Sequence, residues 1–204
     1  MTRPRALLVL CHAAVGAAMV ILALAVLGAS GPVAAHGKRP KGIDLAPLGQ
    51  LVTQAGTRFD MARLRGRPAA VFFGYTHCPD ICPTTMLEMS RHLDQLGRDG
   101  ERLEVLFVTI DPERDSAAHL KDYVGSFHPR IVALTGPPLE VAAVAHAFGA
   151  NYEKVEPKDG GGNYTMDHTA KVYLLDRYGL VASHLEPRQT EKEQLLLLRK
   201  LLAQ

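Results

Sequence analysis

The feature that most constrains the fold is a short apolar run, Ala69 to Tyr75, that leads directly into two closely spaced cysteines. The run follows Arg67-Pro68 and contains a valine and three aromatic residues. This length and composition are typical of a strand that is buried on both faces of a sheet. Cys78 and Cys82 come next, at the start of a predicted helix that continues to about Gly97. The sequence therefore predicts a strand, loop and helix with both thiols at the end of a buried strand.

The remainder of the chain alternates predicted strands with predicted helices. Strands are predicted at Leu103 to Ile110, Ile131 to Leu134, Thr169 to Leu175 and Leu180 to Leu185, and helices at Asp115 to about Ser126, at Leu139 to Phe148 and after Thr190. The segment Asn151 to Met166 is charged and rich in glycine, which indicates a loop or a solvent-exposed hairpin. Alternation gives parallel strands with right-handed crossovers, and the last strand pair adds antiparallel ones. We expect an α/β fold with a mixed central sheet flanked by helices.

Two of the predicted helices carry clear local signals. The helix after the cysteines has apolar residues at spacings of three and four, which predicts a core-facing stripe. The stripe consists of Met86, Met89, Leu93 and Leu96. The last helix begins with Thr190 and Glu193, which have the spacing of a capping box. The two methionines are therefore expected in the core and not among metal ligands.

The first 35 residues differ from the rest of the chain. Arg3 and Arg5 precede a stretch from Ala6 to Ala35 that contains no Lys, Arg, Asp or Glu. The stretch indicates either an export signal that is cut before His36 or an uncleaved membrane anchor, since a spanning helix needs roughly 20 apolar residues. In both cases the body of the protein lies outside the cytoplasm, and the arginines favour an N-terminus on the inside.

The domain organisation follows from this segment. We expect residues 1–35 to be the signal or anchor, 36–48 a polar linker and 49–204 a single domain with its own core. The whole chain has a formal net charge of +2. Two positive charges belong to the N-terminal segment, so the domain is close to neutral. It lacks the basic footprint of nucleic-acid-binding proteins, and nucleic acid is not an expected partner.

Two thiols are available for chemistry in the predicted domain. Of three cysteines, Cys11 lies in the apolar N-terminal stretch, which leaves Cys78 and Cys82. Residues four apart in a helix lie on one face, roughly 5 to 6 Å between Cβ atoms, so both sulfurs can converge on one metal ion. The start of a helix also stabilises thiolate over thiol, which predicts lowered thiol pKa values. The alternative is a structural disulfide, although a bridge across so short a loop stabilises little.

A third ligand is expected among the histidines. Eight histidines follow residue 35, so spacing alone does not select one. His168 stands out because Asp167-His168-Thr169 opens a predicted strand beyond the glycine-rich segment, where a strand end can face the cysteine loop. Two thiolates and an imidazole are soft donors that suit copper, whereas structural zinc usually has four protein ligands. A hydrogen-bonded structural role for His168 remains the alternative.

Three further polar residues, His77, Asp111 and Asp167, are candidates for contacting a metal ligand. Asp111 ends a predicted strand on the edge that carries the cysteine loop, so it either starts a helix or supports the site. His77 is expected to point away along the loop, with a role as ligand or supporting group as the alternative. The histidines expected at the surface or in packing are His92, His119, His128, His146 and His184.

The segment from Phe73 to Thr85 (FGYTHCPDICPTT) resembles the SCO/SenC family of copper chaperones. The likeness continues through Val108 to Asp115 (VTIDPERD), through Asp167-His168-Thr169 and through Tyr173 to Asp176. It covers residues from about 45 to 203. A long match of this kind makes the motif more specific than a lone cysteine pair.

The resemblance implies a thioredoxin-like fold and one Cu(I) or Cu(II) ion bound by Cys78, Cys82 and His168. It also implies assistance in assembling the dinuclear copper centre of cytochrome c oxidase. The implied partner is the copper-bearing subunit of that oxidase or another copper chaperone. With the N-terminal segment, the expected location is the inner (cytoplasmic) membrane with the domain outside the cytoplasm, or the periplasm after export.

A thiol:disulfide oxidoreductase or a redox sensor is the alternative function. There Cys78 attacks, Cys82 resolves, and the pair forms a redox disulfide while it acts on the cysteines of a partner's copper site. Thioredoxin-like reductases resemble one another in a two-residue gap between the cysteines and a proline before the facing strand. Here the gap is three residues, and residues 165–170 contain no proline. These differences favour a metallochaperone over an enzyme.

Overall fold

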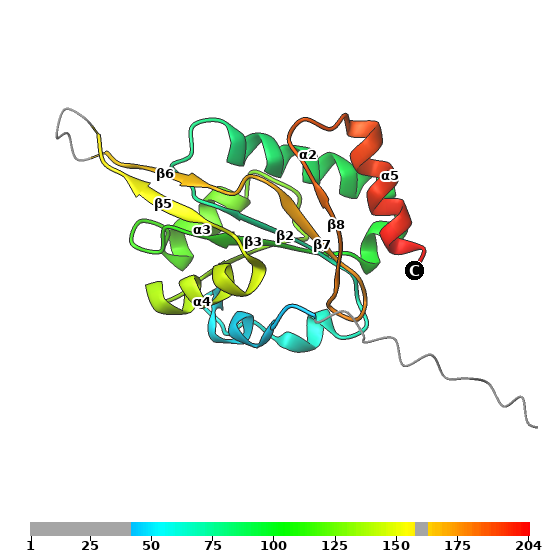
Figure 1. Cartoon of the computed structure of the whole chain (residues 1–204), viewed down its shortest axis with the longest axis horizontal. Coiled ribbons are helices and arrows are strands. Elements are labelled where there is room, and N and C mark those ends of the chain that lie inside the picture. Colours follow the sequence, from blue (N-terminus) through cyan, green and yellow to red (C-terminus); the bar gives the residue numbers. More distant parts are fainter. Residues whose placement is uncertain (1–41, 158–162) are drawn as a thin grey trace, which may run out of the picture. The chain divides into compact units, whose positions relative to one another are not determined.

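The computed structural model describes residues 42–157 and 163–204, which form a mixed six-stranded sheet with helices on both faces (Figure 1). The sheet strands are β1 (Val52–Thr53), β2 (Ala69–Gly74), β3 (Glu104–Thr109), β4 (Ile131–Thr135), β7 (Val172–Leu175) and β8 (Val181–Leu185). The helices are α2 (Ile81–Leu96), α3 (Ala117–Val124), α4 (Pro138–Phe148) and α5 (Glu191–Leu202), with short 3-10 turns η1 (Ala46–Gln50), η2 (Met61–Leu64) and η3 (Asp99–Arg102).

The strand order is β1-β4-β3-β2-β7-β8. The inner strands β2, β3 and β4 run parallel to one another, whereas β7 pairs antiparallel with both β2 and β8. The predicted mixed sheet is therefore confirmed. Every residue of β2 and β3 is buried, as expected of central strands that are covered on both faces.

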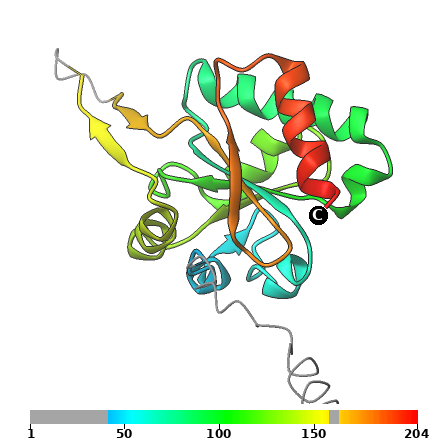
Figure 2. The same ribbon diagram turned by 45° about the vertical axis from the view of Figure 1, so that its right-hand side comes forward.

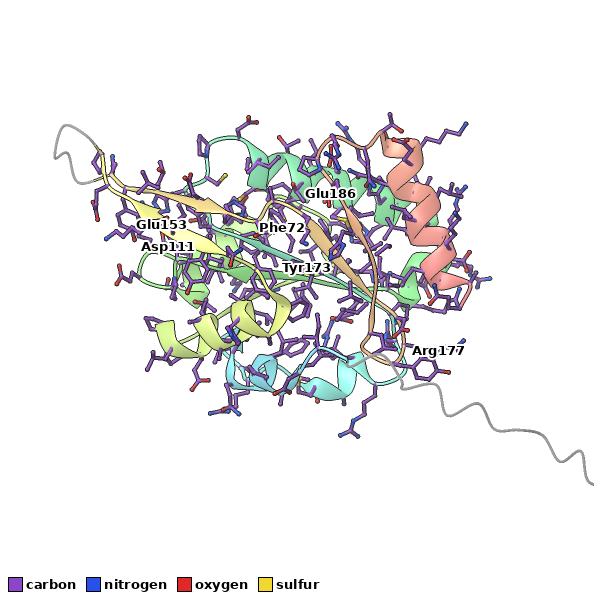
Figure 3. All side chains as sticks on the ribbon, viewed as in Figure 1. Phe72, Asp111, Glu153, Tyr173, Arg177 and Glu186 are labelled. Atoms are coloured by element: carbon purple, nitrogen blue, oxygen red, sulfur yellow. The ribbon has the colours of Figure 1, made fainter. Side chains whose placement is uncertain are left out.

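Helices α2 and α5 cover one face of the sheet, and α4 covers the other (Figures 1 and 2). On the α4 face, the Phe73 ring meets the Phe148 ring edge-on with centroids 5.3 Å apart. On the opposite face, Phe107 packs against Tyr123 of α3 at 5.7 Å. Successive residues of a strand point to opposite faces, so β2 places Phe73 in one core layer and Phe72 in the other. Phe72 and Tyr173 both lie in the interior of the domain (Figure 3).

Both local helix signals are confirmed. The predicted stripe of α2 is buried, with Met86 and Met89 at 1% and 2% exposure. At the start of α5, the Thr190 hydroxyl accepts from the Glu193 backbone N–H, and the Glu193 carboxylate accepts from the Thr190 backbone N–H. This capping box satisfies two backbone donors that the first turn of a helix leaves without partners.

The domain begins before the predicted boundary at Gly49. Leu48 in η1 is fully buried, so the second half of the predicted linker 36–48 packs into the core. The predicted signal or anchor, residues 1–35, lies outside the described residues. None of the helices within residues 42–157 and 163–204 has the length and apolar character that a membrane span requires.

The charged segment before His168 forms a separate antiparallel hairpin of β5 (Tyr152–Val155) and β6 (Thr165–His168), which extends from the end of the domain (Figure 1). This confirms the solvent-exposed hairpin over a plain loop. The prediction that His168 opens the next sheet strand is wrong, because His168 ends β6 and pairs with Tyr152. The chain reaches the main sheet only at Val172. Alternating hydrophobicity does not distinguish one long strand from two strands that belong to different sheets.

Candidate metal centre

Three predicted ligands come together at one end of the sheet. Each of Cys78, Cys82 and His168 offers one donor atom, and these atoms all lie within 4.8 Å of one another. Cys78 belongs to the loop after β2, Cys82 is the second residue of α2, and His168 is the last residue of β6. The cluster therefore joins two parts of the chain that are 86 residues apart in sequence.

The cysteine side of the cluster is embedded in the core. Cys82 is fully buried, and Cys78 is 9% exposed. The Cys82 backbone N–H donates to the Cys78 sulfur at 3.4 Å, so the first turn of α2 orients that sulfur. Both thiols are free. The pair is thus held by backbone geometry, without a disulfide.

Gly74, the last residue of β2, makes room for the Cys82 sulfur. A methyl group at this position lies 2.8 Å from Cys82 Sγ and 2.8 Å from the Phe107 ring. Both separations are far below normal van der Waals contact. Gly74 belongs to the family motif, but its spacing in the sequence indicates no role. The absence of a side chain here is what allows α2 and its thiol to approach the strand.

The predicted lowering of both thiol pKa values is wrong for Cys82. Burial raises the pKa of the Cys82 thiol, and the neighbouring Cys78 sulfur raises it further, against a lowering by the Tyr75 backbone N–H. The free-energy cost of removing the Cys82 thiolate from water exceeds the stabilisation that the start of α2 provides. Cys82 is therefore protonated at neutral pH unless a metal ion displaces the proton.

His168 directs one ring nitrogen at the cysteines. Its Nε2 lies 3.5 Å from Cys82 Sγ. Its Nδ1 lies 3.1 Å from the Thr169 carbonyl oxygen, which can only accept a hydrogen bond. Nδ1 therefore carries the proton, and Nε2 presents its lone pair to the sulfur cluster. A carbonyl in this role fixes the tautomer of a metal-binding histidine.

The His168 ring lies between two aromatic side chains. The rings of Phe72 and Tyr75 both meet it edge-on, with centroids 6.1 and 6.0 Å away. Burial lowers the pKa of His168, although the Thr169 carbonyl and the Asp167 charge act in the opposite direction. The neutral imidazole, which is the form that binds metal, is favoured at neutral pH.

Hydrogen bonds attach the β5–β6 hairpin to the domain near the cluster. The Met166 backbone N–H donates to the Tyr75 hydroxyl at 3.2 Å. The Tyr164 hydroxyl donates to Asp111 at 2.7 Å, and burial together with this bond raises the pKa of Tyr164 to about 12. Arg114 donates to the Asp111 carboxylate, donates to the Tyr164 carbonyl at 3.0 Å and stacks on the Tyr164 ring.

The three supporting candidates have different surroundings. Asp111 lies at the end of the domain from which the hairpin projects and acts on the hairpin, not on a ligand side chain (Figure 3). Asp167 is exposed on β6 and reaches His168 only through its charge. His77 points toward α3, where its ring stacks on His119.

Asp115, which was predicted only as the start of a helix, holds the loop before Cys78. Its buried carboxylate accepts from the Thr76 backbone N–H at 3.1 Å, from the Thr76 hydroxyl at 2.6 Å and from the Thr109 hydroxyl at 2.6 Å. The VTIDPERD segment contained this residue, but nothing in its spacing connected it to Thr76.

The fold is a mixed α/β domain, and the three donors form a candidate site for a soft metal ion. Two sulfurs and a neutral imidazole are donors that copper accepts in both of its common oxidation states. The described residues add no fourth Cys, His, Asp or Glu to this cluster. The arrangement therefore fits an ion of low coordination number better than a structural zinc ion, which usually has four protein ligands.

Comparison with known proteins agrees with this description. The sequence model of the SCO1/SenC family matches residues 44–203. A SCO2-like protein of Rickettsia conorii is 35% identical over 150 residues, which are 74% of this chain and 73% of the relative. The human mitochondrial SCO2 homolog is 35% identical over 153 residues, 72% of this chain and 57% of the relative.

A solved structure of Bradyrhizobium japonicum ScoI with copper bound is also similar. It shares 41% identity and superposes with a TM-score of 0.68 over 74% of this chain and 96% of the other. The chain therefore belongs to the SCO1/SenC family.

Proposed function

We propose that this chain is a copper chaperone that binds one copper ion through Cys78, Cys82 and His168. It assists assembly of the dinuclear copper centre of cytochrome c oxidase, in line with the family it belongs to. The observation that carries the proposal is the approach of His168 Nε2 to within 3.5 Å of Cys82 Sγ. The copper in Bradyrhizobium japonicum ScoI supports the choice of metal.

The chain's own groups favour copper capture in a defined protonation state. His168 is neutral and already points Nε2 at the sulfurs, so it needs no proton loss before binding. The Cys82 thiol loses its proton when the metal arrives. Little side-chain reorganisation is needed, because the three donors already lie within 4.8 Å of one another.

Release of the copper ion proceeds by exchange of ligands with a partner. Cys78 is the cysteine that retains exposure, whereas Cys82 is fully covered. A partner thiol therefore displaces Cys78 first, and the proton of the incoming thiol passes to the thiolate that leaves. His168 and Cys82 are displaced afterwards, so the metal is never free in solution. The partner is the copper-bearing subunit of the oxidase or another copper chaperone.

The position of His168 favours metal binding over thiol:disulfide exchange. An imidazole with its lone pair directed at two clustered sulfurs is a ligand geometry. The raised pKa of Cys82 also lowers its thiolate fraction, on which its attack as the resolving thiol depends.

Copper binding is tested by loading the reduced full chain with Cu(II). We expect one copper per chain with a thiolate-to-copper charge-transfer band in the visible spectrum. His168→Ala and Cys82→Ser should weaken or abolish the band. His146→Ala, which removes an exposed histidine from α4, is the matched control and should leave it unchanged. An intact band in both site variants would refute the three-ligand site.

The physiological role is tested in cells that lack this protein. Wild-type chain should restore assembly of the oxidase copper centre, and His168→Ala should fail. This variant retains both thiols, so a thiol:disulfide oxidoreductase would still restore assembly. If His168→Ala restored assembly of the copper centre and Cys82→Ser did not, the function would be thiol:disulfide exchange.

The N-terminal segment places the domain outside the cytoplasm in this proposal. Residues 1–35 act as a membrane anchor or an export signal, because their apolar stretch is long enough for either. Membrane extraction at alkaline pH distinguishes the two, since an anchored chain stays with the lipid and a cleaved one is released. A mature protein that begins at His36 would establish cleavage.

A further inference from the structure

A second cluster of metal-ligating side chains lies beside the cysteine loop. His77, Asp115 and His119 each offer one donor atom, and these atoms all lie within 4.8 Å of one another. Within residues 42–157 and 163–204, only this cluster and the cysteine site bring three Cys, His, Asp or Glu donors so close together. None of the three is a ligand in the copper function proposed above.

The two histidines come from different elements and face each other. His77 belongs to the loop before Cys78, and its side chain is 45% exposed. His119 is the third residue of α3 and is also exposed. Their rings stack with centroids 5.5 Å apart and an interplanar angle of 11°. Exposed imidazoles in this arrangement can rotate toward a common ion without disturbing the core.

Asp115 provides a fixed carboxylate beside them. Its Oδ2 accepts from the Thr109 hydroxyl and the Thr76 backbone N–H, and its Oδ1 accepts from the Thr76 hydroxyl. Two carboxylate oxygens offer about four acceptor positions, so one position on Oδ1 remains. Oδ1 is the atom that lies 4.0 Å from His77 Nδ1, which also hydrogen-bonds with the Thr76 hydroxyl oxygen at 3.1 Å. The carboxylate oxygen that faces His77 is therefore the one with acceptor capacity left.

We propose that His77, His119 and Asp115 form a second metal site, which takes a divalent first-row transition-metal ion. Bonds from such an ion to imidazole nitrogen and carboxylate oxygen are about 2.0 to 2.2 Å long, so the donors close by roughly 1 Å around it. The rigid Asp115 sets the position, and the exposed rings make the adjustment. Water completes the coordination.

The donor set separates this site from the cysteine site in chemistry. It contains no sulfur, so it selects divalent ions over Cu(I). Among divalent ions, nitrogen and oxygen donors bind Cu(II) more tightly than Ni(II) or Zn(II). His77 immediately precedes Cys78, yet its side chain turns toward α3. The two sites can therefore hold one ion each.

The test uses the full chain with Cys78→Ser and Cys82→Ser, which removes both sulfurs and with them the proposed copper site. Cu(II) is titrated into this variant and followed by electron paramagnetic resonance, with Ni(II) and Zn(II) as competitors. We expect a bound Cu(II) ion with nitrogen hyperfine structure. Adding His119→Ala should weaken binding by about tenfold or more, since loss of even a supporting group costs a metal site 10-fold to 100-fold.

A matched control makes the outcome decisive. His146→Ala on the same background removes an exposed helical histidine elsewhere and should leave affinity unchanged. His119→Ala is expected to fold, because alanine is a better helix former than histidine. Equal effects of His119→Ala and His146→Ala, or no bound Cu(II) at all, would show that the stacked histidines are a packing contact only. Failure of the cysteine site leaves this result unaffected, because both cysteines are absent.

Discussion

The two sides of the proposed copper site differ in how the fold holds them. The cysteine side lies between β2 and α2, with Cys82 fully buried against Gly74 and the Phe107 ring. The histidine side ends a two-stranded hairpin outside the main sheet and is held by a few polar contacts and two aromatic rings. The cysteines are therefore coupled to global stability, whereas His168 is coupled to local contacts.

We therefore expect that metal affinity and stability can be changed separately in this chain. A substitution in the core behind the cysteines forces the side chains around the central sheet to repack. It should therefore lower the free energy of unfolding. A change at the base of the hairpin alters the position of His168 while the six-stranded sheet remains intact. Variants on the two sides should therefore separate into two groups.

The largest expected effect is on stability, from Phe107→Ala. Phe107 is fully buried and packs against Phe72 and Tyr123. Its truncation should reduce the unfolding free energy by about 3 to 5 kcal/mol. Urea unfolding measures this, with the exposed Tyr178→Ala as control at about 0.5 kcal/mol or less. A loss of unfolding free energy under 1 kcal/mol for Phe107→Ala would show that the cysteine side is not coupled to global stability.

Gly74→Ala should affect stability and copper together. The added methyl group meets Cys82 Sγ and the Phe107 ring at 2.8 Å, and overpacking of this kind costs about 1 to 3 kcal/mol. Copper affinity should fall as well, because α2 must move away from β2. The control is Gly49→Ala, whose methyl group meets only the flexible Met61 side chain. Unchanged copper affinity in Gly74→Ala would show that the sulfur position tolerates the shift.

The pH dependence of copper affinity should come mainly from the cysteine side. The raised pKa keeps the Cys82 thiol protonated at neutral pH, so binding releases its proton and affinity rises with pH. For each proton released on binding, copper affinity should rise about tenfold per pH unit, which corresponds to about 1.4 kcal/mol of binding free energy. The lowered pKa of His168 means that imidazole protonation adds to the slope only at pH below 6.5.

Competition with a Cu(I) chelator between pH 6.5 and pH 8 measures this slope. Any copper binding that remains in Cys82→Ser should release one proton fewer, so the affinity should rise less steeply with pH. A flat profile in wild type would mean that Cys82 is already a thiolate, in conflict with its burial.

The smallest expected effect comes from the hairpin. Tyr164→Phe removes the hydroxyl that donates to Asp111 at 2.7 Å, a bond that contributes about 0.5 to 1.5 kcal/mol. Copper affinity should fall by no more than about tenfold, with the urea midpoint nearly unchanged. Tyr152→Phe is the control, since it removes a hydroxyl from the facing strand and leaves the Tyr164–Asp111 bond in place. A large loss of stability in Tyr164→Phe would show that the hairpin is coupled to the core, in conflict with the difference between the two sides.

Much of the fold was predictable because its signals are local. The buried runs of β2 and β3 and the stripe of α2 depend on periodicity within one element. The capping box of α5 depends on two residues three apart. The division of the final segment into β6 and β7 was missed, because the partners Tyr152 and Val71 that separate them lie far away in sequence.

The candidate site divides in the same way. Cys78 and Cys82 could be paired from spacing, and His168 followed from the family resemblance. The raised pKa of Cys82 could not be foreseen, since desolvation depends on what surrounds the sulfur in three dimensions. The positioning roles of Gly74, Asp115 and the Thr169 carbonyl were hidden for the same reason.

The residue order alone was enough to predict the alternating strands and helices, the cysteine pair and the apolar N-terminal stretch. These features depend on residue type and on spacing within one element. Only the tertiary structure decided which nitrogen of His168 faces the sulfurs, how the hairpin is attached and that His77 meets His119. Contacts between distant segments set these features, because burial and hydrogen bonding arise when the chain folds and not from the order of residues along it.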